Sequence, residues 1–507
     1  MTTVLVVALI LPAIATVICA FAPRRVTHAL TVLTGSATFV FALTLVPAVA
    51  DHTIAIGFLR VDALSMVFFL ATAFLYAATA IYSIGYFAHE QRDSQRSGGG
   101  ASAAFTRYSR RFYVGLNAFA WSMLCASSVN GLALLWIAIE VTTVVSALLV
   151  AIDNTEGATE AAWKYVLIAS SGLGIGLLAT IVMYYAGSQV LGDSYDLAFD
   201  PLLSQAAGLP ATPVKLAFVL AVVGFGTKVG LFPVHTWLPD AHAEAPTPVS
   251  ALLSGSLLAV SFYAILRYYQ VAIVTLGTHF PQTVLLVFGV LSLLLAGLYV
   301  LDQSDVKRLL AYSSVEHMGI LAIGVSFGAP LAYAGVLLHV LAHAAAKGNA
   351  FMGAGVLVRR FGTKELARMR GGIDALRWSG PLFLMSIFAL SALPPFGLFR
   401  SEFQIVAGGL GNGRHAAAAA LIILVTLAFL GLATAVTRVL FSPAESDHSA
   451  PDSPGSAHAS PSAEPSIWMV VPVVAGVVVL VVLGVHPPAV LVNLLTDGAA
   501  ELQGAGR

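Results

Sequence analysis

The feature that most constrains the fold is a series of apolar runs that are each long enough to cross a membrane. A helix rises 1.5 Å per residue, so about 20 apolar residues cover a hydrocarbon core of roughly 30 Å. Fourteen such runs occur, at residues 3–22, 26–50, 63–87, 112–129, 131–151, 162–187, 214–242, 247–272, 282–302, 307–327, 329–357, 379–410, 415–441 and 466–486. The sequence therefore predicts an all-α polytopic membrane protein with about 14 transmembrane helices.

Composition agrees with a membrane protein and excludes several other classes. Hydrophobic residues make up 58% of the chain and charged residues 10%, with a mean hydropathy of +0.88, whereas about a quarter of the residues in soluble domains are charged. The net charge of zero argues against nucleic acid as a partner. Cys19 and Cys125 lie in apolar runs without CxxC or Cys/His spacing. We therefore expect no metal site, no iron–sulfur cluster and no other cofactor in this chain.

Two of the apolar runs are interrupted by prolines. The seventh run breaks at Pro233 and Pro239, and the twelfth breaks at Pro394 and Pro395. A helix broken inside a membrane is tolerated where its freed backbone lines a cavity, and such helices mark the pathway in transporters. The two breaks lie five spans apart, and an odd offset inverts the topology. Spans 4–8 and 9–13 are therefore predicted to form two inverted five-helix repeats.

These patterns divide the chain into five expected parts. They are the first three spans with the following loop (1–111), the first repeat (112–272), the second repeat (273–441), a flexible polar loop (442–466), and the last span with a tail (467–507). Segments 88–111 and 442–466 are polar and are expected to be solvated, flexible loops. Most of the 25 lysines and arginines fall in the loops on one predicted side, which the positive-inside rule assigns to the cytoplasm. Both termini are then expected outside the cytoplasm.

Ionisable residues inside the apolar runs are the candidate functional residues. Even on lenient insertion scales, a charge at mid-membrane costs about 2.5–3.5 kcal/mol, so each such residue needs a partner or a function. His339, His343 and Lys347 are spaced i, i+4 and i+8 and share one helix face. The complete set is Glu140, Lys228, Glu316, His317, His339, His343, Lys347 and Glu402, with His235 and His242 in the interruption of the seventh run.

Lysine and histidine in this setting suit proton transfer. Desolvation lowers the pKa of a lysine and an adjacent carboxylate raises it, so a moving charge switches the ammonium between loaded and empty. Histidine passes protons through its two ring nitrogens near neutral pH. The alternative is a set of buried ion pairs and hydrogen-bonded histidines that only hold helices together. His235 and His242 fit this alternative as well as the first, because either can cap freed carbonyls.

Four sequence runs then resemble a known family. TKVGLFPVHTWLPDAHAEAPTPVSALLSG, LLAYSSVEHMG, HVLAHAAAKGNAF and ALPPFGLFRSEF are similar to segments of the antiporter-like membrane subunits of respiratory complex I and of multisubunit sodium/proton antiporters. The resemblance implies fourteen helices with two inverted five-helix bundles and a role in moving protons. It further implies Glu140 and Lys228 as the input pair, Lys347 as the central lysine and Glu402 as the terminal acid.

Two details narrow the resemblance. The glutamate before the histidine in AYSSVEHMG resembles the F component of hydrogenase-4 and formate hydrogenlyase type complexes. Complex I members carry a lysine in the eighth span, where this chain has Ala259, so the link between the two half-channels is expected to use water, Ser256, Ser261 or Tyr263.

The sequence therefore predicts a proton-translocating membrane subunit of a hydrogenase-like oxidoreductase in the inner (plasma) membrane. Because no redox centre is expected in this chain, other membrane subunits and a soluble oxidoreductase arm are the expected partners. Four alternatives remain open: a subunit of a cation/proton antiporter, a subunit of a complex I-type NADH dehydrogenase, a module for proton-coupled inorganic-carbon uptake, and a scaffold that does not pump.

Overall fold

A computed structural model describes residues 1–96, 101–443 and 466–504. Most of these residues are in helices, and a single two-stranded hairpin is present among them. The helices are α1 (Thr2–Phe21), α2 (Arg24–Asp51), α3 (Ala63–Arg96), α4 (Ala101–Ala126), α5 (Leu132–Val150), α6 (Glu156–Leu191), α7 (Phe199–Ser204), α8 (Ala211–Val229), α9 (Leu238–Glu244), α10 (Thr247–Leu252), α11 (Leu258–Leu276), α12 (His279–Leu301), α13 (Val306–Ser326), α14 (Pro330–Phe361), α15 (Gly372–Ala375), α16 (Ser379–Leu390), α17 (Gly397–Gly411), α18 (His415–Phe441), α19 (Ile467–Val485) and α20 (Ala489–Glu501).

Short elements complete the chain. Three 3₁₀ turns cover Ala151–Asp153, Ala206–Gly208 and Leu366–Arg368, and one π-helical turn covers Leu253–Leu257 between α10 and α11. The hairpin pairs β1 (Ile54–Ile56) with β2 (Leu59–Val61) in antiparallel register, Ile54 opposite Val61.

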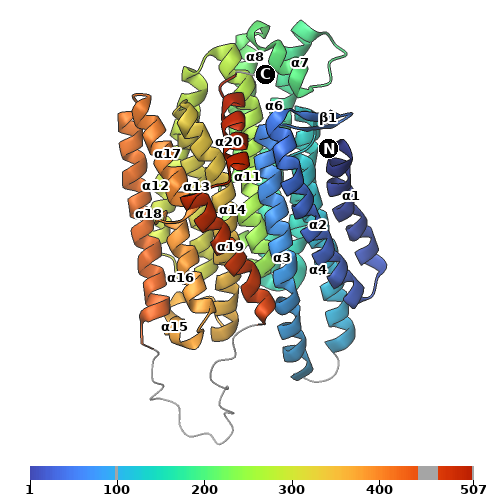
Figure 1. Ribbon diagram of the computed structural model, residues 1–507, viewed down its shortest axis with the longest axis vertical. Coiled ribbons are helices and arrows are strands. Elements are labelled where there is room, and N and C mark those ends of the chain that lie inside the picture. Colours follow the sequence, from blue (N-terminus) through green and yellow to red (C-terminus); the bar gives the residue numbers. More distant parts are fainter. Residues whose placement is uncertain (97–100, 444–465, 505–507) are drawn as a thin grey trace, which may run out of the picture.

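The long helices stand side by side along the longest axis of the molecule, and both termini lie at the same end (Figure 1). Twelve helical segments among the described residues are long and apolar enough to cross a membrane. The protein is therefore a multi-pass membrane protein, and the predicted all-α polytopic fold is confirmed. Each of the fourteen predicted spans coincides with a helix or with a pair of helices. The inverted relation between the two five-helix units stays a prediction.

Both predicted helix breaks are present. The seventh span consists of α8, a turn and the short α9, and the chain leaves α8 through Gly230, whose φ of 83° lies in the left-handed region that glycine adopts without strain. The twelfth span consists of α16 and α17, separated at Pro394 and Pro395.

Proline supplies no backbone N–H and disfavours the interior of a helix, and Pro233, Pro394 and Pro395 lie in the interruptions. Pro239 instead lies in the first turn of α9, where proline is tolerated. Proline alone does not determine a break, because Pro12, Pro47 and Pro472 lie inside helices.

The prediction of a flexible loop over 88–111 is wrong in extent. Helix α3 continues to Arg96 and α4 begins at Ala101, so both helices extend beyond their apolar runs. The sequence 88–96 contains neither proline nor glycine, and nothing local ends the helix there. Most of the predicted loop at 442–466 lies outside the described residues. The predicted tail after the last span contains the helix α20, which packs against α2, α3 and α14.

Helix α14 occupies a central position, because it packs against α3, α10, α13, α16, α17, α19 and α20. The segment from α10 to α11 and helices α13 and α14 are almost wholly buried. Helices α13 and α14 bear five of the ten predicted functional residues, namely Glu316, His317, His339, His343 and Lys347. Function is therefore expected inside the bundle, where water is excluded and each polar group depends on its protein neighbours.

Candidate functional site

The first polar group inside the bundle surrounds Lys228. Its side chain is fully buried, and Nζ donates to the Thr143 hydroxyl at 2.7 Å and to the Tyr165 hydroxyl. The same Nζ lies 4.6 Å from the centroid of the Tyr165 ring. Tyr165 OH is also 2.7 Å from Ser146 Oγ. The buried ammonium is thus surrounded by hydroxyl groups on α5 and α6 that either donate or accept a proton.

Glu140 lies one helical turn before Thr143 on α5. One carboxylate oxygen accepts a hydrogen bond from Ser170 Oγ at 3.1 Å, and the other, Oε2, is buried without a protein hydrogen-bond partner. Among the described residues, the ion pairs closer than 4.0 Å do not include Glu140 with Lys228. The direct partner of Lys228 on α5 is Thr143, three residues after Glu140. The two predicted partners therefore lie in the same part of the bundle without forming an ion pair.

A row of rings leads away from this group. Tyr165 stacks on Trp237, with centroids 4.4 Å apart, and Trp237 lies 6.0 Å from the ring of His242. His242 is fully buried on α9, its Nδ1 is 2.8 Å from the Leu238 carbonyl oxygen, and its Nε2 has no partner. Because a carbonyl only accepts, Nδ1 carries the hydrogen and Nε2 offers a free lone pair. His235 is also buried, and its Nδ1 has no partner.

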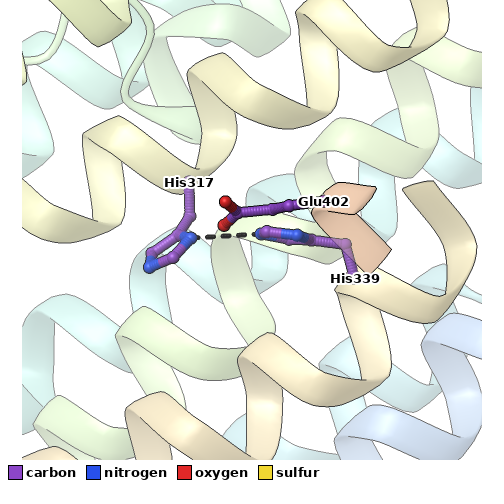
Figure 2. Close-up of side chains that lie close together, drawn as sticks. All are labelled: His317, His339 and Glu402. Atoms are coloured by element: carbon purple, nitrogen blue, oxygen red, sulfur yellow. Dashed lines mark hydrogen bonds between the residues drawn. The ribbon is translucent and has the colours of Figure 1, made fainter. Parts of the chain in front are cut away.

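A second polar group lies where α13, α14 and α17 meet. Figure 2 shows His317 and His339 facing one another, with the Glu402 carboxylate beside the line that joins their rings. His317 Nδ1 and His339 Nε2 are 3.1 Å apart, and His339 Nδ1 is 3.1 Å from Ser401 Oγ. The ring of His343 lies 5.0 Å from that of His317 and 6.2 Å from that of His339. We call His317, His339, His343 and Glu402 the histidine cluster.

Lys347 and Glu316 lie near the histidine cluster on α14 and α13. Lys347 is fully buried and donates to the backbone carbonyl of Leu310 at 2.9 Å, and Glu316 is 5% exposed. The side chains predicted to form one polar stripe on α14 are all buried, and the two histidines of that stripe are near neighbours. Sequence spacing alone therefore placed these side chains correctly on one face of the helix.

The acids in the interruption of the seventh span have a different setting. Asp240 forms ion pairs with Lys164 and Arg308, and Glu244 pairs with Lys364 at 3.0 Å. Their cationic partners are 33 to 48% exposed, unlike the buried lysines. These pairs join α9 to α6, to α13 and to the segment after α14, so they hold the broken helix in place.

The eighth span, which lacks the lysine of complex I members, contains a π turn at Leu253–Leu257. Ser256 Oγ is 2.6 Å from Thr72 Oγ1, and Ser254 Oγ is 2.7 Å from Ser314 Oγ. Ser261 donates to its own helix, and Tyr263 accepts from Arg267. Among the three side chains expected to replace the lysine, none bonds directly to a predicted relay residue. Ser254, which was not among the three, is the residue of the eighth span whose hydroxyl contacts α13, at Ser314.

Three residues of the site were missed by sequence reasoning. Tyr165 and Trp237 contact Lys228 and His242, and Ser401 contacts His339. Only Tyr165 carried a usable signal, since a phenol inside an apolar run needs a hydrogen-bond partner when it is buried. Ser401 directly precedes Glu402, but its contact depends on how α17 packs against α14.

A separate ionic network lies at the end of the bundle that holds the termini. Arg267 Nη2 donates to both carboxylate oxygens of Asp62 at 2.7 Å, and Arg60 also pairs with Asp62. Burial acts to raise the pKa of Asp62, but the positive charges of Arg267 and then Arg60 outweigh it and hold that pKa below its usual range. Glu501 of α20 accepts from the Ala63 backbone N–H at 3.1 Å.

Comparison of the chain with known families gives one match that covers most of its length. Residues 129–431 match the family described as NADH:quinone oxidoreductase/Mrp antiporter, TM. The Hydrogenase-4 component F homolog of Methylacidiphilum infernorum is 36% identical over 374 residues, which is 73% of this chain and 76% of the relative. Hydrogenase-4 component B of Escherichia coli is 31% identical over 357 residues, 68% of this chain and 50% of the relative.

Solved structures share the fold over the whole chain. A chain of the membrane-bound sulfane sulfur reductase, an archaeal respiratory membrane complex, has a TM-score of 0.83 at 18% identity, with 99% of this chain and 98% of that chain covered. A chain of the Mrp complex from Dietzia sp. has a TM-score of 0.80 at 20% identity, with 99% and 97% covered. A chain of respiratory complex I from Thermus thermophilus has a TM-score of 0.79 at 23% identity, with 99% and 100% covered.

Proposed function

Because the chain belongs to the NADH:quinone oxidoreductase/Mrp antiporter family of membrane proteins, we propose that it is the proton-translocating membrane subunit of a hydrogenase-like oxidoreductase related to complex I. The observation that carries this proposal is a series of buried titratable groups from Lys228 to the histidine cluster. Buried lysines away from acidic partners are costly in a bilayer and mark ion pathways. The likeness to hydrogenase-4 components F and B supports the hydrogenase-like branch.

The proposed path begins at Glu140 and Lys228 and ends at Glu402. A proton reaching Glu140 changes the charge near Lys228, whose hydroxyl neighbours Thr143 and Tyr165 accept or return a proton. In the proposed path the proton passes from Lys228 to His242, which has one free ring nitrogen, and then to Lys347. His235 and Glu316 are supporting groups, since both are buried beside the path.

The last part of the proposed path uses the histidine cluster. His317 and His339 already share a hydrogen bond, so a proton added at one ring can leave from the other after tautomer exchange. Glu402 is beside that bond (Figure 2) and receives the proton.

The two lysines of the proposed path, Lys228 and Lys347, suit a switch because the proton affinity of a lysine responds to nearby charge. An arginine in the same place would stay protonated.

The proposed setting follows from the relatives. Their names place them in hydrogenase-4, in respiratory complex I and in the Mrp complex, so we propose other membrane subunits and a soluble oxidoreductase arm as partners. We further propose the inner (plasma) membrane, with both termini outside the cytoplasm. The five parts predicted from the sequence, with inverted repeats at 112–272 and 273–441, complete the proposal.

Purification of the tagged chain in mild detergent tests the assignment. The expected result is co-purification with other membrane subunits and with a soluble arm that carries redox centres, together with redox-driven proton uptake when the complex is placed in vesicles. Sodium should have no effect, because a hard cation needs several oxygen ligands and the path contains two lysines. A lone protein with full transport activity, or a saturable sodium requirement, would favour a cation/proton antiporter instead.

A further inference from the structure

We propose that His317, His339 and Glu402 form a binding site for a divalent transition metal such as Zn²⁺, and that the bound metal blocks proton transfer through the histidine cluster. Each of the three residues offers one ligand atom, and these atoms lie within 4.8 Å of one another. Two imidazole nitrogens and one carboxylate oxygen are a ligand set that binds zinc in proteins.

The spacing of the donors fits a tetrahedral ion after a small adjustment. With bonds of about 2.0 Å, a tetrahedral zinc separates its ligand atoms by about 3.3 Å. His317 Nδ1 and His339 Nε2 are already 3.1 Å apart. The Glu402 carboxylate must approach this pair by less than about 1.5 Å to complete three of the four ligands, and it already points toward the pair (Figure 2).

Hydrogen bonding around His339 prepares that ring as a ligand. Ser401 Oγ donates its hydrogen to the Leu398 carbonyl at 2.8 Å, so Ser401 can only accept from His339 Nδ1. His339 therefore carries its hydrogen on Nδ1 and presents the Nε2 lone pair to His317. A ligand histidine in a metal site is held in the same way, by an acceptor on its second nitrogen.

Unpartnered atoms supply the rest of the site. His317 Nε2 and both ring nitrogens of His343 are buried without a protein hydrogen-bond partner, and so is Glu402 Oε1. When a metal takes His317 Nδ1, the hydrogen on that ring can move to Nε2. His343 or a water then provides the fourth ligand. The ligand groups of His317, His339 and Glu402 are all buried inside the bundle.

Blockage of proton transfer follows from where the metal would lie. The ion would replace the hydrogen shared by His317 and His339 and would hold the carboxylate of Glu402 in its ionised form, with any proton on that carboxyl released to solvent. Three groups of the proposed path would then be unable to accept a proton. This part of the inference rests on the proposed function, whereas metal binding stands on the geometry alone.

Metal retention by the purified complex tests the site without reference to pumping. The complex is equilibrated with Zn²⁺, washed with a weak chelator and analysed for bound zinc, and Co²⁺ is used in parallel because its visible spectrum reports tetrahedral nitrogen and oxygen ligands. The variants are Glu402→Gln, His339→Gln and Ser401→Ala. His28→Gln is the matched control, since His28 Nε2 also lacks a partner but His28 lies on α2.

The expected result is one equivalent of metal in the wild-type complex and in His28→Gln. Glu402→Gln and His339→Gln should lose it. Ser401→Ala keeps all three ligands and should bind at least about 10-fold more weakly, because the acceptor that orients the His339 ring is gone. Retention that is absent in the wild type, or equal in all variants, would overturn the site.

Proton uptake by the same samples tests the blockage. Zn²⁺ should abolish redox-driven uptake in the wild type and in His28→Gln over the range of concentrations that fills the site. Full uptake with the site occupied would overturn the blockage while leaving the site. A complex that binds the metal but never takes up protons would contradict the proposed function and not the metal site.

Discussion

Lys228 is fully buried, and among the described residues its Nζ donates hydrogen bonds to the hydroxyl groups of Thr143 and Tyr165. Lys228→Met keeps a long apolar side chain in the same space and removes the proton carrier. We expect the variant to assemble normally and to lose redox-driven proton uptake by at least about tenfold, a change of about 1.4 kcal/mol in a barrier. Proton uptake in vesicles, normalised to assembled complex, is the measurement. Lys215→Met is the control, since Lys215 is an exposed residue on the same helix.

Lys228→Arg separates proton transfer from a structural role. A guanidinium stays protonated at any accessible pH and cannot pass its proton on, although it keeps the charge and the hydrogen-bond donors. We expect loss of uptake comparable to that of the methionine variant. If Lys228 only holds α5, α6 and α8 together, the order reverses: arginine should then retain near-normal uptake and methionine should impair assembly.

At the scale of elements, the position of Lys228 depends on the close approach of α6 and α8. A Cβ added at Gly224 would lie 2.4 Å from the backbone nitrogen of Gly176 and 2.9 Å from the Gly172 carbonyl oxygen, and backbone atoms cannot move aside as a flexible side chain can. Gly224→Ala should therefore separate the two helices and destabilise the protein by about 1–3 kcal/mol.

The matched control for this change is on the partner helix. An added Cβ at Gly174 meets nothing within 4 Å, so Gly174→Ala should be neutral or slightly stabilising, because alanine favours helix over glycine. Thermal inactivation of the purified complex compares the two. Equal stability of both variants would show that α6 and α8 tolerate a wider separation than the structure implies.

The elements show which features local sequence can determine. Apolar length predicted the positions of the long helices, twelve of which are long and apolar enough to cross a membrane among the described residues. Pro233, Pro394 and Pro395 marked the two interruptions, because the effect of proline acts within one helix. The length of α3 was underestimated because a helix continues past its apolar run when nothing stops it. No feature of the sequence predicted the π turn at Leu253–Leu257.

Contacts between helices were predicted less completely. The spacing of His339, His343 and Lys347 revealed one helix face, since that relation is local. The bond from His339 to His317 and the one to Ser401 require α13, α14 and α17 to pack at one level, which spacing within a run does not specify. The same reason explains why Thr143 and Tyr165, rather than Glu140, are the direct partners of Lys228.

At the scale of the whole molecule, the orientation in the membrane can be tested from two exposed serines. Ser204 at the end of α7 and Ser304 before α13 belong to opposite predicted sides. In a background with Cys19→Ala and Cys125→Ala, Ser204→Cys should react with a membrane-impermeant thiol reagent in intact cells. Ser304→Cys should react only after the cells are opened. The reverse pattern would place both termini in the cytoplasm.

The ionic network at Asp62 joins distant parts of the chain, since Asp62 precedes α3, Arg267 lies on α11 and Glu501 ends α20. Asp62 is 1% exposed and Arg267 is 2% exposed, so the carboxylate neutralises a charge that has little access to water. Asp62→Asn leaves that guanidinium without its anion. Removal of one partner of a buried pair costs about 3–5 kcal/mol, and we expect a loss of this size at pH 7.

The pH dependence of this loss follows from the depressed pKa of Asp62. A carboxyl whose pKa is lower in the folded than in the unfolded protein stabilises the fold above the unfolded value of about 3.9, and this contribution is lost as pH falls toward the folded value. The difference in thermal unfolding between wild type and Asp62→Asn should therefore be largest at neutral pH and should begin to shrink only below about pH 4. Asp200→Asn is the control: Asp200 pairs with Arg60 but is 60% exposed, and an exposed pair contributes at most about 1 kcal/mol. Equal effects of the two substitutions at pH 7 would show that burial of the Asp62 pair does not determine its contribution.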